Sequence, residues 1–345
     1  MGKRAVSIYD IAKLAGVSTA TVSNVLNNKG SYSDKTRDLV LRIAREQGYV
    51  ANFAAKSLRE SSTKTIAIIT PDVSNDFFSN LVLDVEGHLR EAGYSSYICN
   101  TANDPERETT YVLDLLSKQV DGLVFIGGTA RMTIETNVDV PVVHIDHTGN
   151  SGMNREVFVG NDMPRLSYDM TKTLFDRGCR RIALASVSAS LYRTAEHDQA
   201  AGYYAFLQEH GIVLDKNLVL EGPHRQTSLL EAEQLVNECL ANGFQFDGVV
   251  ALGDRVALGV VNALKSHGID VGTDVLVIGM DDSIYSRIST PSISTVNRHT
   301  GEMAERGVEV LLSMLRGEGP AETHLIVNHD VVERATTLGA TSQLD

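Results

Sequence analysis

The fold of the N-terminal part is decided by residues 7–27, which read SIYDIAKLAGVSTATVSNVLN. Ser7 and Asp10 form an S-x-x-D helix start, in which the serine oxygen accepts an amide hydrogen bond and the acid favours the positive end of the helix dipole. Apolar residues then recur at helical spacing at Ile8, Ile11, Ala12 and Ala15. The spacing predicts a short helix that buries one face and ends at Gly16.

A second helix is predicted from a cap at Ser18 to Asn27. Its inward positions are apolar, and its outward positions are small, polar and uncharged: Thr19, Ala20, Ser23 and Asn24. Two helices joined by a short glycine-containing turn are typical of the helix-turn-helix, whose second helix enters the major groove of DNA. A third helix is predicted from Ser33 to about Gln47, with Leu39, Val40, Ile43 and Ala44 closing a small core.

Charge is distributed unevenly along the 345 residues. Residues 1–60 contain ten basic and five acidic side chains, a net charge of +5, whereas the whole chain carries −13 and the other 285 residues therefore carry −18. A basic head on an acidic body suits a terminus that binds a polyanion. Random surface charge is the alternative, and the helix-turn-helix pattern favours DNA.

Several classes of protein find no support in the sequence. No apolar run approaches the roughly 20 residues of a membrane span, and the first residues lack the apolar stretch of a secretory signal. Three scattered cysteines, Cys99, Cys179 and Cys239, make no disulfide framework, so a cytoplasmic location is expected. Metal-ligand spacings, the phosphate loop and the GxSxG nucleophile turn are lacking, and we predict no enzyme, cofactor or metal site.

The N-terminal part resembles the headpiece of the lac repressor (LacI) family. The likeness rests on residues 8–13, 15–18 and 21–23, and Gly48, Tyr49 and residues 52–58 extend it. It covers nearly the whole chain and implies a sequence-specific transcriptional regulator, expected to be a repressor, that binds double-stranded operator DNA. By position it assigns DNA contacts to Ser7, Tyr9, Ser18, Thr19, Ala20, Thr21, Ser23, Asn24, Asn27 and Ser31 in a headpiece over 1–50, and to Asn52, Ala55, Lys56 and Leu58 in a hinge helix and linker over 51–63.

Two residues depart from the family pattern. Asn24 stands where many members have arginine, and Ala51 where they have proline. Arginine favours guanine, whereas asparagine pairs with adenine N6 and N7, so we expect an operator with altered outer bases. The alternative is that Asn24 is merely solvated.

The hinge helix is predicted to be unfolded in isolation, because residues 52–59 make only two helical turns. In the family this helix forms when two copies meet in the minor groove, where the residue matching Leu58 is inserted between base pairs. The alternative is that Leu58 packs on the body. Ala51 is predicted to raise the entropy cost of ordering the hinge by about 0.4 to 1 kcal/mol.

From residue 64 the pattern changes to apolar strands that alternate with amphipathic helices. Strands are predicted at 65–70, 97–98, 122–126 and 140–145, then at 181–185, 218–220, 247–251 and 276–279; helices near 77–92, 105–118, 163–177, 198–210, 228–242 and 254–267. This alternation predicts α/β architecture with two doubly wound parallel sheets. The resemblance implies a two-lobed periplasmic-binding-protein-like body over 64–340, with an N-lobe at about 64–162 plus 291–321 and a C-lobe at about 163–290 plus 322–340.

A ligand is expected between the lobes, beyond the carboxyl ends of the strands. The residues after the strands offer carboxylates, an amide, a guanidinium and phenylalanine rings, which suit a polyhydroxylated effector such as a sugar or a sugar derivative. The resemblance matches the family's ligand positions to Phe77, Phe78, His147, Asn161, Arg193, Gln199, Asp254 and Asp281. The alternatives are a helix cap for Asp254 and ordinary core for Phe77 or Phe78.

Gln199 leaves the class of effector open. Sugar-binding members commonly have an arginine at this position, and glutamine cannot supply its cationic, bidentate donors. Arg193 is an alternative cation, which would favour an acidic or phosphorylated sugar. The sequence leaves both an inducer and a corepressor open.

Two other functions share parts of the pattern. A solute-binding transport protein would have the same body, but with a signal peptide in place of the helix-turn-helix. An acid-base or metal site assembled from His144, Asp146, His147 and Asp281 would make an enzyme, yet such residues without a third ligand are more often satisfied polar groups. The chain lacks the leucine heptad tail of tetrameric members, so a homodimer is expected.

Overall fold

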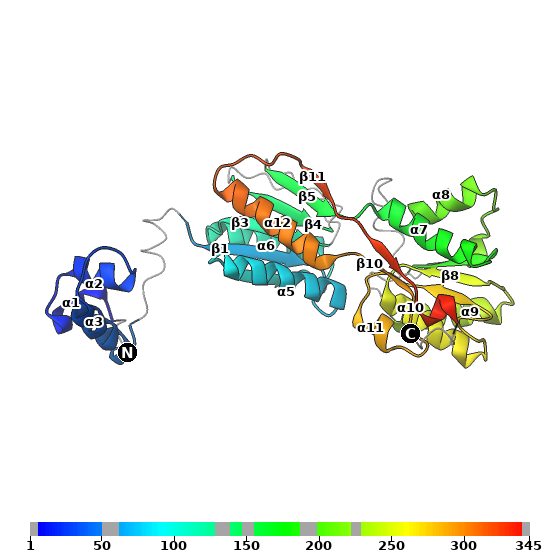
Figure 1. Ribbon diagram of the computed structural model, residues 1–345, viewed down its shortest axis with the longest axis horizontal. Coiled ribbons are helices and arrows are strands. Elements are labelled where there is room, and N and C mark those ends of the chain that lie inside the picture. Colours follow the sequence, from blue (N-terminus) through cyan, green and yellow to red (C-terminus); the bar gives the residue numbers. More distant parts are fainter. Residues whose placement is uncertain are drawn as a thin grey trace. The chain divides into compact units, whose positions relative to one another are not determined.

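The computed structural model describes residues 6–49, 62–127, 139–146, 155–186, 199–221 and 229–339. They form two compact units, one that ends at Thr63 and one that begins at Lys64. The first is all-α and the second contains two α/β lobes with parallel sheets, which confirms the predicted fold class (Figure 1).

The headpiece consists of helices α1 (Ile8–Ala15), α2 (Thr19–Leu26) and α3 (Asp34–Glu46). Ser7 and Asp10 make a reciprocal capping box at the start of α1, and Gly16 ends this helix with φ 66°. Ser18 and Ser33 cap α2 and α3 as predicted. Their apolar faces meet in one small core, in which Ile11, Val22 and Val40 are completely buried. Leu39 of the predicted core is only partly buried.

The first lobe of the body has a six-stranded parallel sheet in the order β11-β5-β4-β3-β1-β2. Its strands are β1 (Thr65–Thr70), β2 (Ser95–Asn100), β3 (Gly122–Ile126), β4 (Val142–Ile145), β5 (Glu156–Gly160) and β11 (His324–Ile326). Helices α5 (Asp76–Glu91) and α12 (Thr300–Leu315) pack on one face and α6 (Pro105–Ser117) on the other (Figure 1). All six carboxyl ends therefore lie at one edge of the sheet.

The second lobe has a four-stranded parallel sheet in the order β7-β6-β8-β9. Its strands are β6 (Ile182–Ser186), β7 (Val219–Glu221), β8 (Gly248–Ala251) and β9 (Leu276–Ile278). Helices α9 (Leu229–Ala241) and α10 (Asp254–Ser266) cover one face, and α7 (Met163–Asp176) and α8 (Ala201–Glu209) the other. The short helices η1 (Lys216–Leu218), α11 (Ile284–Ile288) and α13 (Ala335–Leu338) complete the lobe.

The chain passes between the lobes three times: after β5, after β10 (Thr295–Asn297) and between β11 and β12 (Asp330–Val332). The last two crossings are joined, because β10 and β12 pair antiparallel. Both of these crossings lie a few residues further along the chain than the predicted lobe boundaries at 290 and 321. Ile293 packs in the second lobe's core, so that lobe extends beyond 290, and β11 pairs with β5, so the first lobe extends beyond 321.

No helix within the described segments is long and apolar enough to span a lipid bilayer.

Candidate nucleic-acid interface and interlobe cleft

The outer surface of α2 is built from small side chains. Ala20 and Asn24 are exposed, and Thr19, Thr21 and Ser23 are partly exposed. The Ser18 hydroxyl accepts from the Thr21 amide at 3.1 Å, which fixes the helix start whose remaining amides point outward. Such a smooth helix face lets the backbone approach a groove closely.

The other predicted DNA-contact residues of the headpiece are either exposed or hydrogen-bonded to neighbouring headpiece groups. Tyr9 on α1 is 73% exposed, and Ser31 is also exposed. The Asn27 amide donates to the Ser23 carbonyl at 2.8 Å, so this side chain is held against its own helix. Asn24 lies beside Gly30, where an added Cβ would come within 3.0 Å of the Asn24 Nδ2. The glycine therefore leaves room for the asparagine.

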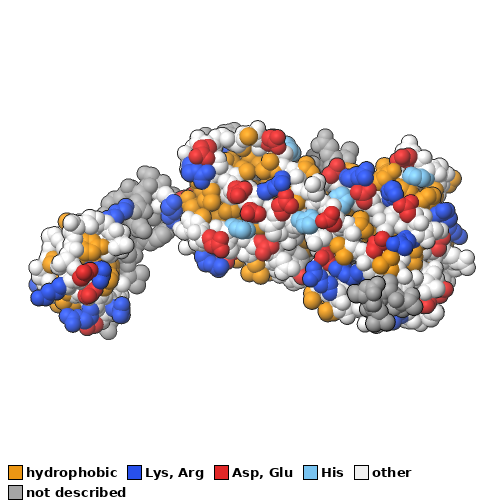
Figure 2. All heavy atoms as spheres, viewed as in Figure 1, with side chains coloured by type: hydrophobic (Ala, Val, Ile, Leu, Met, Phe, Trp, Pro, Cys, Tyr) orange, Lys and Arg blue, Asp and Glu red, His pale blue; other side chains and the backbone are white. Residues whose placement is uncertain are grey.

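Basic side chains are exposed on this small unit. Lys and Arg groups are spread over the headpiece surface in Figure 2, and Lys13, Lys29, Lys35, Arg42 and Arg45 are exposed. Exposed cations of this kind bind phosphates without reading sequence.

The interlobe cleft is organised by Arg298, which sequence analysis did not single out. Its side chain is 2% exposed. The Nε group donates to Asn161 Oδ1 at 2.9 Å, Nη2 donates to Asp146, and Nη1 lies 3.4 Å from Asp281 Oδ1. Asp146 follows β4 of the first lobe and Asp281 follows β9 of the second. One guanidinium thus joins carboxylates from both lobes.

Asn161 connects the crossings of the chain. Its Nδ2 group donates to the Val327 carbonyl at 2.9 Å and lies 3.2 Å from the Arg298 carbonyl, while its oxygen accepts from Arg298. The amide predicted to contact the effector is therefore engaged by the chain itself.

The two predicted phenylalanines occupy different places. Phe77 is 5% exposed, and the Arg298 guanidinium lies 4.3 Å from its ring centroid. Phe77 belongs to the core of the first lobe and also lines the cavity beside Asp281, and one face of its ring is covered by the arginine. Phe78 is partly buried and packs against Gly127 at the end of β3, where an added Cβ would lie 2.3 Å from the ring.

Asp254 holds the turn that carries Asp281. It is the first residue of α10, but its carboxylate accepts from the Ser283 amide at 2.7 Å and from the Thr295 hydroxyl at 2.6 Å instead of capping its helix. Burial raises the pKa of Asp254 to about 6, against the effect of these hydrogen bonds. Gln199 is partly buried just before α8.

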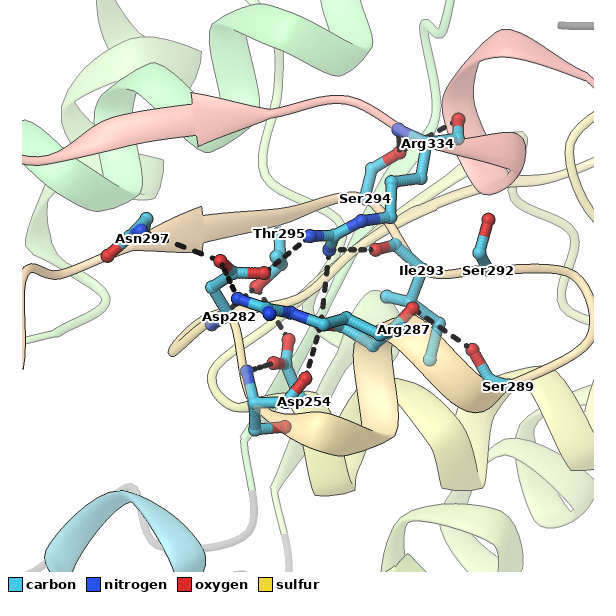
Figure 3. A network of polar contacts seen from close by, with 12 residues as sticks. Asp254, Asp282, Arg287, Ser289, Ser292, Ile293, Ser294, Thr295, Asn297 and Arg334 are labelled. Carbon is cyan, nitrogen blue, oxygen red and sulfur yellow. Dashed lines mark hydrogen bonds and ion pairs between the residues drawn. The ribbon is translucent and has the colours of Figure 1, made fainter. Parts of the chain in front are cut away.

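The turn of Asp281 and Asp282 is constrained from two sides. Their φ angles of 107° and 49° are unusual for residues with a side chain. Arg287 and Arg334 converge on the Asp282 carboxylate at 2.9 and 2.5 Å (Figure 3). Burial also raises the pKa of Asp281, while the Arg298 guanidinium opposes this shift.

A cavity of about 360 Å³ lies beside this turn. Its lining includes polar side chains from both lobes, among them Asn80, Asp84, Asp281, Arg287, Asn297 and Thr300. Carboxylates, amides and a hydroxyl in one cavity can donate to and accept from a ligand rich in hydroxyl groups.

Family models match both parts of the chain. Residues 7–52 match the bacterial regulatory proteins of the lacI family, and residues 171–337 match the periplasmic binding protein-like domain. The HTH-type transcriptional regulator RegA of Clostridium saccharobutylicum is 32% identical over 337 residues, which cover 97% of this chain and 100% of the relative. The chain belongs to the lacI family.

Solved structures of similar proteins extend over the same length. The lac repressor dimer bound to operator and the anti-inducer ONPF has a TM-score of 0.83 at 24% identity, and the match covers 97% of this chain and 100% of that one. The complex of the transcriptional regulator CelR with cellobiose has a TM-score of 0.67 at 25% identity, with 96% and 99% covered. This lacI-family chain has the lac repressor fold.

Membership of the lacI family makes the protein a DNA-binding transcriptional regulator. These relatives are regulators and not enzymes, in agreement with the prediction from the sequence. Of the predicted site residues, Asn52, Ala55, Lys56 and Leu58 of the hinge, and His147 and Arg193 of the cleft, lie outside the described residues.

Proposed function

We propose that this lacI-family protein is a cytoplasmic, homodimeric repressor whose operator affinity is controlled by a sugar or sugar derivative between the lobes. The observation that carries the proposal is the meeting of Asp146 and Asp281, from opposite lobes, in one buried polar cleft. A molecule that hydrogen-bonds both lobes changes the free energy of their relative orientation, which is how binding at one site couples to another. CelR, which is similar over nearly the whole chain, was solved with cellobiose.

Exposed apolar side chains support the homodimer. Leu83 on α5 is 63% exposed, and Tyr97 and Ile98 on the neighbouring edge strand β2 are about half exposed. Ile284 and Ile288 give α11 of the second lobe a similar surface. Adjacent exposed apolar groups are typical of protein interfaces, and α5 and β2 are neighbouring elements, although Leu83 also lines the cavity beside Asp281. The similar lac repressor was solved as a dimer on its operator.

The small outer face of α2 and the basic headpiece surface support direct contact with operator bases and phosphates. In this proposal Thr19, Ala20, Ser23 and Asn24 face the major groove, and the hinge residues Asn52, Ala55, Lys56 and Leu58 contact the minor groove. Neutralisation of phosphates by the exposed lysines and arginines makes the affinity fall steeply with salt concentration.

Binding selection on random duplexes, followed by titration of the selected duplex with the full-length protein, tests DNA recognition. A panel of neutral sugars, sugar acids, sugar phosphates and purines is then added at fixed protein concentration. We expect one compound to change the operator affinity at least tenfold, with the response lost in Asp281→Asn while DNA binding remains. A protein that retains no duplex selectively, or whose affinity no compound of the panel changes, contradicts the proposal.

A further inference from the structure

We propose that Arg298 determines the charge class of the effector. It is a resident cation that occupies the space between Asp146 and Asp281 where the cationic group of a ligand would otherwise bind, and it thereby reserves the cleft for uncharged, hydroxyl-rich molecules. The inference rests on the proposed function, in that a small molecule is taken to bind between the lobes.

The guanidinium nitrogens of Arg298 are engaged in contacts with other residues of the protein. All three guanidinium nitrogens contact cleft residues, with Nε on Asn161, Nη1 on Asp281 and Nη2 on Asp146. The thioether of Met163 lies 3.4 Å from Nη2. An anionic ligand would have to break these contacts in a buried place before it could reach the cation. A guanidinium held between two carboxylates is therefore not a phosphate-binding group.

Among the described residues, the charge around the cleft also disfavours an anion. Several acidic residues lie at or beside the cavity: Asp84, Asp254, Asp281 and Asp282. Another, Asp146, is paired with Arg298. The neighbouring cations Arg287 and Arg334 are both paired with Asp282 (Figure 3).

The space that Arg298 fills has the composition of a cation site. Asp146 and Asp281 supply oxygen acceptors, Asn161 a third, and the Phe77 ring a face that the guanidinium covers at 4.3 Å. Carboxylates together with an aromatic face bind guanidinium and ammonium groups strongly. Without the arginine, the same walls would bind the cationic group of a small molecule.

Chemical rescue tests this assignment. Full-length Arg298→Ala is titrated with methylguanidinium, with its uncharged isostere methylurea as the matched ligand, and thermal unfolding is followed. We expect methylguanidinium, at tenfold excess over its Kd, to raise the Tm of Arg298→Ala by about 2 to 4 °C, and methylurea to leave it unchanged. The control is Arg316→Ala, which removes an exposed arginine paired with Glu318 and should show no rescue.

A second variant keeps the test decisive where Arg298→Ala does not fold. Asp146→Asn leaves the guanidinium with one carboxylate, and its affinity for glucose 6-phosphate relative to glucose should be at least tenfold higher than the same ratio in the parent. Equal stabilisation of Arg298→Ala by methylurea and methylguanidinium, or a parent that binds glucose 6-phosphate or glucosamine tenfold more tightly than glucose, would overturn the proposal. Rescue in a protein whose DNA binding responds to no sugar would refute the proposed function and leave the role of Arg298 standing.

Discussion

Glu108 provides a quantitative test of the lobe structure. This residue of α6 is 7% exposed, and burial alone raises its pKa from 4.5 to about 7. Between about pH 4.5 and 7, the Glu108 carboxyl is therefore protonated in the folded protein but ionised in the unfolded chain. A raised folded pKa in an acid gives stability that is greatest at low pH and falls as the pH rises from about 4.5 to 7. At about 1.4 kcal/mol per pKa unit, the ionised carboxylate costs about 3 kcal/mol above pH 7.

The substitution Glu108→Gln keeps the shape of the side chain and removes the titration. We compare the free energy of unfolding of the variant with that of the parent. The difference should shift in favour of the variant by about 2 to 3 kcal/mol when the pH is raised from 5 to 8, whatever its value at pH 5. Urea denaturation of the full chain at both pH values measures the change, with the transition of the body followed separately from that of the headpiece.

The matched control is Glu106→Gln. Glu106 lies in the same first turn of α6 as Glu108, but its side chain is exposed in the folded protein. This variant should therefore not show the gain expected of Glu108→Gln. A stability difference for Glu108→Gln that is the same at both pH values, or that favours the parent more at pH 8, would show that the carboxylate is solvated or paired and would refute the reasoning.

Three further predictions concern the headpiece and the cleft. Asn24→Ala should relax the preference for adenine at the outer position of each half-site and weaken binding there by about 1 to 3 kcal/mol, and a selected guanine that is insensitive to this change would contradict it. Ser18→Ala should destabilise the headpiece by about 1 kcal/mol, measured by amide hydrogen exchange of α2, and Ser18→Asp should restore it; equal exchange in all three proteins would exclude the cap. Gly127→Ala should destabilise the body more than Gly93→Ala, because both have positive φ but only at Gly127 does the new Cβ meet the Phe78 ring; equal losses in urea denaturation would refute that contact.

Local chemistry made much of the fold predictable. The caps at Ser7, Ser18 and Ser33 are short-range interactions, so the sequence determines where the headpiece helices begin. The fully buried strands of both sheets contain short apolar runs, such as residues 66–69 of β1. Strand β5, whose residues alternate between buried and partly buried, did not give this signal.

Two strands that sequence analysis omitted depend on distant partners, whereas the omitted helix α12 has a local amphipathic pattern. Strand β5 (Glu156–Gly160) alternates between buried and partly buried residues, and the three-residue β11 is a strand because it pairs with β5 across more than 150 positions of the chain. The crossings moved for the same reason, since Ile293 and Ser294 are fixed by contacts with the second sheet and not by their own sequence. Pairing between distant segments, and not propensity, sets these boundaries.

Arg298 escaped sequence analysis because nothing local distinguishes a buried arginine from a solvated one. It stands in the polar run Asn297-Arg298-His299, and its two carboxylate partners lie 17 and 152 residues away along the chain. An unpaired arginine would not be buried at this depth, so its burial follows only once the two lobes have brought Asp146 and Asp281 together. The residue that sets the charge of the cleft is thus defined by the interlobe arrangement itself. A rearrangement of the lobes that separates Asp146 from Asp281 would break at least one contact of Arg298, so these contacts contribute to the free-energy difference between lobe arrangements.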